Sequence, residues 1–324
     1  MTAADLTRSE IEQNGPILFE RFMELALYAP GEGYYVRERD PFGVRGDFFT
    51  AEQLQPVFGI VIGQFIDTIR QGMGAPERFE VVQLGAGRAE MGEALAANFR
   101  YTPVDVGRGE MPERIRGVVF ANEFFDALPV HLVARRSGVF RNVRVGIEGD
   151  RFVPIDAEPT SGAVLAYLER NYGEAEDDSL IEVHLRGLDW MDRIAAALEG
   201  VLIVIDYGYT AREWMVRHTA GTLMSYRQHT ASPDVFDDPG NRDITSHVPF
   251  TVLEDRAVER GFRVERFHTL ARFLLDVGEK DQFAAALAAN GEKEAVRRRM
   301  QLKTLLYSLG ETFRVLVLDK RPTQ

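Results

Sequence analysis

The sequence predicts an α/β protein built on a doubly wound, mostly parallel sheet. Three observations point to this class. Strand-like runs alternate with helical stretches, the run 201–205 is almost purely apolar, and the apolar run 79–84 leads into a glycine turn followed by a helix. An apolar run of that kind is typical of a strand buried on both faces. Alternation of strands and helices places helices on both faces of a parallel sheet.

The elements are expected in a definite order. A helical N-terminal segment comes first, with apolar residues at helical spacing from Leu18 and again over 55–71. A β-hairpin insertion follows the first half of the sheet, at 132–153, with turns near Ser137 and Gly149. C-terminal helices are expected over 270–309. The strands of the sheet are expected at 79–84, 101–106, 117–121, 201–205, 262–267 and 313–318.

These elements suggest three segments of chain. Residues 1–77 form a helical segment with a glycine- and aromatic-rich loop at 28–49. Residues 78–269 form the core, which carries an insertion at about 131–190. Residues 270–324 supply the C-terminal helices and the last core strand.

Composition narrows the functional classes. The chain has 324 residues, 38 Lys and Arg against 50 Asp and Glu, a net charge of −12 and no cysteine. A nucleic-acid scaffold is not expected, because phosphate binding needs clustered cations. Disulfides and thiolate metal sites are excluded. We expect no membrane span and a cytoplasmic location, since no run is apolar enough and the polar, acidic N-terminus resembles no targeting segment.

The glycine turn at Gly85, Ala86 and Gly87 is the central signal for a cofactor. Backbone at such a turn can approach a ligand closely, and the following helix presents free N–H groups. A dinucleotide fingerprint would need a third glycine at position 90. That residue is Glu90, whose carboxylate would repel a pyrophosphate. S-adenosyl-L-methionine (SAM) is a sulfonium cation without phosphate, so this turn favours SAM over NAD(P).

The usual SAM turn is an acid, then three glycines at alternate positions. It corresponds here to Gln83, Gly85, Gly87 and Ala89, so the first and last positions depart from the pattern. Asp105 lies 20 residues after the first glycine and ends a strand, where a carboxylate can bind the ribose hydroxyls. Both cofactor classes use such an acid, and a surface aspartate in a loop is the alternative.

Several short motifs occur in one order along the chain. They are Leu-Tyr-Ala-Pro-Gly-Glu-Gly-Tyr-Tyr at 27–35, Gly-Asp-Phe-Phe-Thr-Ala at 46–51, Ala-Asn-Glu-Phe-Phe-Asp-Ala-Leu-Pro-Val at 121–130, Ile-Asp-Tyr-Gly-Tyr at 205–209, Gly221-Thr222-Leu223 with Tyr226 and His229, and Asp243-Ile244-Thr245 with His247-Val248. In this order the chain resembles the MidA-type proteins, the mitochondrial complex I assembly factor 7 family, which are class I SAM-dependent methyltransferases. The resemblance covers residues 22 to about 318.

The resemblance implies a Rossmann-like class I fold, SAM as cofactor and protein arginine methylation. It implies an arginine-bearing protein as partner, which is a mitochondrial respiratory-complex subunit for eukaryotic members. An assembly chaperone that keeps the fold but has lost turnover is the alternative, because Gln83 and Ala89 depart from the cofactor motif. An NAD(P)-dependent oxidoreductase is a third option, disfavoured by Glu90.

Carboxylates at the carboxyl edge of the sheet are the candidate catalytic residues. A guanidinium is planar, and paired carboxylates can orient it through bidentate hydrogen bonds. We expect Glu123 to be the main guanidinium ligand and Asp126 its support, with a helix-capping role for Asn122 or Asp126 as the alternative. Asp206 ends the most apolar strand, where it takes a substrate-side or a structural-turn role. Asn122 is also counted among the cofactor-binding residues.

The remaining candidates lie in loops. Asp47 is expected to close over the cofactor and Phe48 or Phe49 to pack on the adenine, although aromatic residues there are equally typical of loop packing. His229 and His247 are candidate proton acceptors or orienting groups, and a structural role is the alternative for each. No histidine spacing suggests a metal site, so no catalytic metal is expected.

Overall fold

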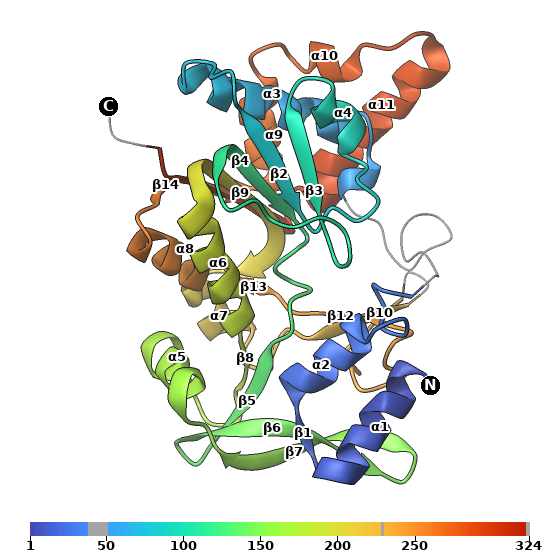
Figure 1. Ribbon diagram of the computed structural model, residues 1–324, viewed down its shortest axis with the longest axis vertical. Helices are drawn as coiled ribbons and strands as arrows, with labels where there is room; N and C mark the ends of the chain where they lie inside the picture. Colours follow the sequence, from blue (N-terminus) through green and yellow to red (C-terminus); the bar gives the residue numbers. More distant parts are fainter. Residues whose placement is uncertain (38–50, 228–229, 322–324) are drawn as a thin grey trace. The chain divides into compact units, whose positions relative to one another are not determined.

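The computed structural model describes residues 1–37, 51–227 and 230–321 (Figure 1). These residues form two compact units that interleave along the sequence. The core unit comprises Thr50–Phe125, Met191–Gly208 and Glu254–Gln324, and the second unit comprises Met1–Phe49, Asp126–Trp190 and Tyr209–Leu253. The predicted segments 1–77, 78–269 and 270–324 describe order along the chain, and they stay a prediction.

The sheet of the core unit runs in the order β14-β15-β9-β4-β2-β3. Strands β9, β4, β2 and β3 are mutually parallel, whereas β15 is antiparallel to both of its neighbours. Leu84 on β2 lies level with Val104 on β3 and Ala121 on β4, so the residues that follow these strands gather at one edge. The bounds are β2 (Glu80–Leu84), β3 (Arg100–Val104), β4 (Ile115–Asn122), β9 (Leu198–Tyr209), β14 (Arg263–Thr269) and β15 (Phe313–Asp319).

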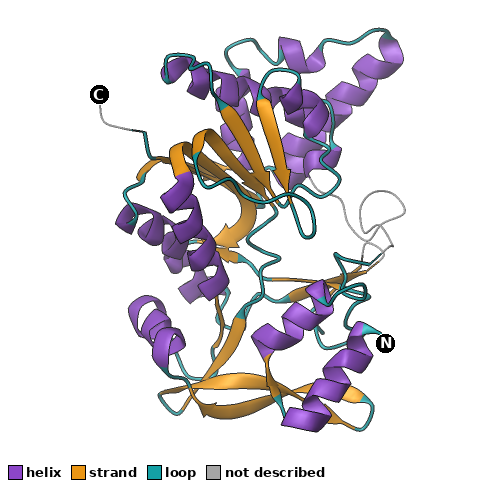
Figure 2. Cartoon of the chain, viewed as in Figure 1, coloured by secondary structure: helices purple, strands orange, loops and turns teal. Residues whose placement is uncertain are grey.

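Helices cover both faces of this sheet (Figures 1 and 2). On one face α3 and α9 share an apolar core, in which the rings of Phe65 and Phe273 lie 4.9 Å apart. Beside β4 and β9, α6 joins α8 through Asp192, whose carboxylate binds Arg256 and Arg260 at 2.6 and 2.7 Å. The elements are η1 (Ala51–Gln53), α3 (Val57–Gly72), α4 (Gly92–Ala96), α6 (Leu185–Ala197), α8 (Phe250–Glu259), α9 (Leu270–Gly278), α10 (Ala284–Leu287), α11 (Glu292–Thr304) and η2 (Leu305–Leu309).

The second unit contains two antiparallel sheets. The expected hairpin is confirmed as β5 and β6, and β7 extends it beyond the turn at Gly149. Helix α2 packs on this sheet, with the ring of Phe22 5.8 Å from that of Phe152. The strands of these two sheets are β1 (Ile17–Leu18), β5 (His131–Arg136), β6 (Val139–Glu148), β7 (Arg151–Pro159), β8 (Leu180–Val183), β10 (Met224–Arg227), β11 (Thr230–Ser232) and β12 (Asp243–Thr245). The short strand β13 (Val248–Pro249) belongs to neither of them. The helices are α1 (Ala3–Asn14), α2 (Phe19–Tyr28), α5 (Gly162–Tyr172) and α7 (Ala211–Arg217).

Two helical regions add detail to the expected elements. Helix α1 occupies the polar start of the chain, where Thr2 and Asp5 form a capping box that stabilises its N-terminus. The C-terminal helices expected over 270–309 are α9, α10, α11 and η2, and Phe283, which precedes α10, takes a left-handed backbone with φ of 58°. No helix in the described ranges is both long enough and apolar enough to cross a bilayer.

Candidate active site

The glycine turn follows β2 directly and has the backbone that its sequence predicts. Gly85 and Gly87 have φ of 66° and 51°, values that residues with a Cβ seldom adopt. A Cβ at Gly85 would lie 3.1 Å from the ring of Phe124, so a side chain there would also be crowded. Ala86 is fully buried, and its N–H donates to the carbonyl of Val104 at 3.2 Å.

Asp105 ties this turn to the end of β3. One carboxylate oxygen accepts the N–H of Gly87 and the other accepts the N–H of Val106 at 2.6 Å. Arg108 closes the same loop by donating to the carbonyl of Gly87 at 3.1 Å. Asp105 thus lies beside the turn as expected, and its binding of ribose hydroxyls stays a prediction.

Gln83 has two partners in the interior of the core unit. Its amide nitrogen donates to Oε1 of Glu52 at 2.7 Å, and its amide oxygen accepts the hydroxyl of Tyr101 at 2.6 Å. Gln83 is 0% exposed and Glu52 only 5%. The position where the SAM motif has an acid therefore holds an amide, and a carboxyl group from η1 lies next to it.

The environment of Glu52 disfavours its charge. Burial raises the pKa of this carboxyl well above its usual range, and the hydrogen bond from Gln83 opposes that shift. The negative charges of Glu123, Glu90 and Asp105 raise the pKa further. Several carboxylates thus act on Glu52 beside the turn, a setting that suits a cation and disfavours a phosphate.

Glu123 follows β4 at the same sheet edge. Its φ of 50° is left-handed, a strained conformation for a residue with a side chain, and such strain concentrates at functional sites. Its Oε1 accepts the N–H of Ala51 and the side-chain N–H of Asn122, both at 3.2 Å. Its own N–H donates to the carbonyl of Ile205 at 2.9 Å. These contacts position the carboxylate after the strand.

Asn122 and Asp206 support this segment. No helix begins in the described stretch between Asn122 and His131, so the helix-capping alternative for Asn122 and Asp126 is wrong. The Asp206 carboxylate, 0% exposed, accepts the N–H groups of Phe125 and Tyr207 at 3.1 and 3.0 Å. This geometry fits the structural-turn role for Asp206, and a substrate-side role stays a prediction.

Other candidates belong to the second unit. Asp126 is 4% exposed, and its backbone carbonyl accepts the N–H of Ser246 at 3.0 Å. The backbone N–H of His247 donates to the hydroxyl of Thr222 at 3.0 Å, and burial lowers the pKa of the His247 ring to about 4. An imidazole with that pKa is neutral near pH 7 and has a lone pair that can accept a proton. Whether these two residues act in catalysis stays a prediction.

Four predicted residues, Asp47, Phe48, Phe49 and His229, lie outside the described residues. Among residues 1–37, 51–227 and 230–321, no group of three or more His, Asp or Glu side chains is arranged to hold a metal ion.

Sequence reasoning missed two sets of polar contacts. Glu52 and Tyr101 join Gln83, yet neither belongs to a recognisable cofactor pattern. In the second unit the hydroxyl of Tyr35 donates to Asp243 at 2.8 Å. Tyr35 and Asp243 both lie in the ordered motifs of the sequence, so that order was the signal that could have found them.

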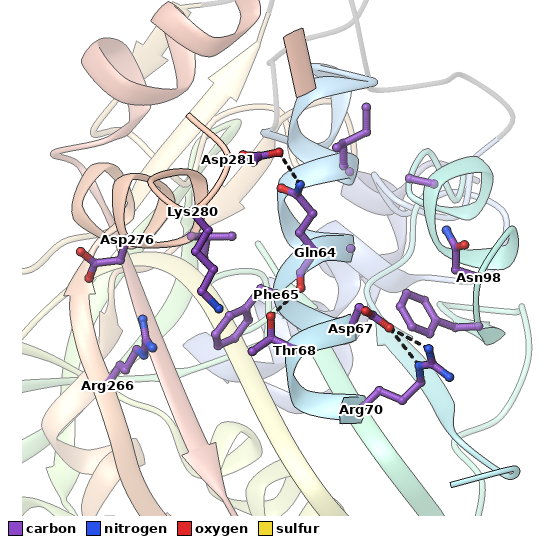
Figure 3. A pocket seen from close by; sticks show the side chains of 16 residues that line it. Gln64, Phe65, Asp67, Thr68, Arg70, Asn98, Arg266, Asp276, Lys280 and Asp281 are labelled. Carbon is purple, nitrogen blue, oxygen red and sulfur yellow. Dashed lines mark hydrogen bonds and ion pairs between the residues drawn. The ribbon is translucent and has the colours of Figure 1, made fainter. Parts of the chain in front are cut away.

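A cavity of about 640 Å³ lies against α3 (Figure 3). None of the predicted site residues that the structure describes lines it. Asp67 pairs with Arg70 at 3.0 Å, and Asp281 accepts from Gln64 at 2.9 Å, so these carboxylates already have partners. We assign this cavity no part in the site.

The sheet edge and the turn together fit SAM. Gly85 and Gly87 have left-handed backbone without side chains, which allows a ligand to approach the backbone closely. Asp105 supplies a carboxylate after β3, and the buried carboxyl of Glu52 suits a cationic ligand. These features are typical of a nucleotide-type cofactor site in a doubly wound fold, and which of these residues bind SAM stays a prediction.

Comparison with known proteins identifies the family. Residues 95–268 match the family described as "Putative S-adenosyl-L-methionine-dependent methyltransferase". The chain belongs to this family, and the expected fold, cofactor and enzyme class are confirmed.

A solved structure similar to this chain supports the same family. It is a COG1565 superfamily member from Burkholderia thailandensis bound to S-adenosyl-homocysteine, 30% identical, with a TM-score of 0.86 over 98% of this chain and 91% of that one. Two curated relatives are named protein arginine methyltransferases of the NDUFAF7 type. The Drosophila melanogaster protein is 25% identical over 96% of this chain and 83% of its own length. The Homo sapiens protein is 25% identical over 76% of this chain and 67% of its own length.

The expected cytoplasmic location is contradicted by the same comparison. Both curated relatives are named as mitochondrial proteins. The expectation depended on the polar, acidic residues at the start of the sequence, and their composition is not a sufficient guide to where the protein works.

Proposed function

We propose that this protein transfers the methyl group of SAM to an arginine side chain of a protein substrate. The observation that carries the proposal is the Glu123 carboxylate, held after β4 on a left-handed backbone by Ala51 and Asn122. Curated relatives named protein arginine methyltransferases support the choice of arginine.

The chemistry of arginine explains the need for a carboxylate. A guanidinium has a pKa above about 12 and spreads its charge over three nitrogens, so none is a good nucleophile. Glu123 can accept N–H groups from the guanidinium, hold its plane and draw positive charge away from the attacking nitrogen. SAM, when bound, supplies a methyl group on a sulfonium leaving group, and the residues of the chain therefore need chiefly to position the acceptor.

The remaining candidates take supporting roles in the proposal. Asp206 holds the backbone of Phe125 and so fixes the segment that carries Glu123. Asp126 and His247 are proposed as substrate-side groups of the second unit, Asp126 as a further carboxylate and His247 as a neutral proton acceptor.

The test is transfer of labelled methyl groups from SAM to an arginine-bearing protein. Glu123→Gln should bind SAM normally and lose about a hundredfold or more of turnover, because the amide keeps the shape of the side chain and lacks its charge. Glu123→Gly tests the backbone separately, since glycine accepts the left-handed conformation and should stay folded while losing turnover. Glu113→Gln, an exposed residue before β4, is the matched control and should keep full activity. Near-normal turnover of Glu123→Gln would exclude this residue as the guanidinium ligand.

Methyl-arginine proteomics identifies the target. Host cells with and without the protein should differ at one or a few methyl-arginine sites, and subunits of respiratory complexes are the first place to search. If no methyl-arginine changes and purified protein binds SAM without turnover, the assembly-chaperone alternative replaces the enzyme.

A further inference from the structure

A buried acid lies next to the position where the cofactor motif lacks one. Gln83 stands in the place of the motif's acid, and its amide nitrogen donates to Oε1 of Glu52 at 2.7 Å. Glu52 comes from η1, 31 residues earlier in the sequence, and is 5% exposed. The core unit therefore has a carboxyl group beside the end of β2, delivered by a different element.

The hydrogen bonds fix how this carboxyl is held. Tyr101 donates to the amide oxygen of Gln83 at 2.6 Å, so the amide nitrogen of Gln83 faces Glu52 and donates to it. That single bond engages Oε1. No other hydrogen bond joins the Glu52 carboxyl to the described residues, so Oε2 is free to accept a donor.

The charges around Glu52 leave it without a cation. Burying a carboxyl costs free energy unless a donor or a positive charge compensates. The charged groups that act on Glu52 most strongly are Glu123, Glu90 and Asp105, all of the same sign. A side chain placed at such a cost, beside a cofactor turn, is explained if the missing cation comes from the ligand.

We propose that Glu52, oriented by Gln83, is the carboxylate that binds the cationic end of SAM in this chain. The amide at position 83 and the acid at position 52 together replace the single acid of the usual motif. The ammonium and the sulfonium lie at the same end of the cofactor, remote from the adenine, and either can pair with this carboxylate. The inference depends on the family's cofactor and not on the proposed arginine substrate, so the two can fail separately.

Calorimetric titration without any methyl acceptor tests the proposal. Three probes are compared: SAM with both cations, S-adenosyl-homocysteine with the ammonium alone, and 5′-methylthioadenosine with neither. Glu52→Gln should weaken SAM about tenfold to a hundredfold and leave methylthioadenosine unchanged, because the variant removes a charge and keeps the shape. If Glu52→Gln weakens S-adenosyl-homocysteine as much as SAM, the contact is with the ammonium. If the affinity for S-adenosyl-homocysteine is unchanged, the contact is with the sulfonium.

Two results would overturn the proposal. Unchanged SAM affinity in Glu52→Gln would mean that the carboxylate does not face the cation. Equal weakening of SAM and methylthioadenosine would mean that Glu52 only maintains the fold of the turn.

Two further variants separate charge from folding. Glu93→Gln removes an exposed negative charge from α4 and should change SAM affinity less than about twofold, since exposed charges are screened. The exchange variant Glu52→Gln with Gln83→Glu returns an acid to the motif position and should recover SAM binding. The proposal would also be contradicted by a folded exchange variant that binds methylthioadenosine normally but has no higher affinity for SAM than Glu52→Gln alone.

Discussion

Two residues with side chains adopt left-handed backbone beside the cofactor turn. Ala89 has φ of 61° and Glu123 has φ of 50°. Such conformations cost free energy and persist where the surrounding structure imposes them. At Glu123 the cost accompanies a carboxylate that accepts the N–H groups of Ala51 and Asn122, on a backbone whose own N–H donates to the carbonyl of Ile205. At Ala89, where the usual motif has glycine, the strain has no accompanying side-chain function.

Ala89→Gly should therefore stabilise the protein. Left-handed backbone costs a residue with a Cβ about 1–2 kcal/mol, and the greater entropy of unfolded glycine offsets part of that gain. We expect the free energy of unfolding, from urea denaturation at pH 7, to rise by about 0.5–1 kcal/mol. Ala96→Gly, in α4, should instead lower it by up to about 1 kcal/mol. A fall for Ala89→Gly would show that the methyl group of Ala89 contributes packing that exceeds the strain.

Among the elements, η1 links the glycine turn to the segment that carries Glu123. Its three residues are held at two points, because the N–H of Ala51 donates to Glu123 and the carboxyl of Glu52 accepts from Gln83. Gln83 in turn holds Tyr101 on β3. One short helix thus joins the ends of β2 and β4, and Gln83 is the residue through which β2 and β3 contact it.

Gln83→Leu tests this link. Leucine has a similar volume but leaves the carboxyl of Glu52 and the hydroxyl of Tyr101 without partners, and each buried polar group left unpaired costs about 1–3 kcal/mol. We expect the free energy of unfolding, measured by urea denaturation, to fall by about 2–4 kcal/mol in total. Tyr101→Phe removes only one of the two bonds and should cost about 1 kcal/mol. Equal losses for the two variants would mean that the Gln83 to Glu52 bond contributes no stability.

At the scale of the whole molecule, much of the core site was predictable. Parallel strands end at one edge of a sheet, so residues that follow β2, β3 and β4 must lie near one another, and Gly85, Asp105 and Glu123 do. Glu52 could not be found this way, because its partner is distant in sequence and its own segment has no periodic pattern. The alternative in which Asn122 or Asp126 caps a helix failed for a related reason, since no helix follows these residues in the described chain and tertiary contacts hold the segment instead.

The second unit buries titratable groups whose effects on stability oppose one another. Glu182 is 0% exposed and accepts the N–H of Thr222 at 2.6 Å, and burial raises its pKa. Because the folded protein holds this proton more tightly, the free energy of unfolding falls as the pH rises from the ordinary pKa of a glutamate toward the raised pKa of Glu182 in the folded protein. Burial lowers the pKa of His184 to about 3 and that of His247 to about 4, which makes stability fall as the pH drops. The Glu182 carboxyl and these two imidazoles therefore have opposite effects on how stability changes with pH.

His184→Phe isolates the acid side of this balance. The unfolded ring binds a proton near pH 6.5, whereas the folded ring stays neutral until about pH 3, so its contribution is present above 6.5 and lost as the pH falls. Between pH 7 and pH 5 the natural protein should lose about 2 kcal/mol more of unfolding free energy than the variant. Urea denaturation at pH 7 and at pH 5 measures the difference. The comparison of pH 7 with pH 8 is the internal control, because the ring is then largely neutral in both the folded and the unfolded state and the two proteins should change alike. Parallel behaviour of the two proteins down to pH 5 would show that the fold does not hold His184 neutral.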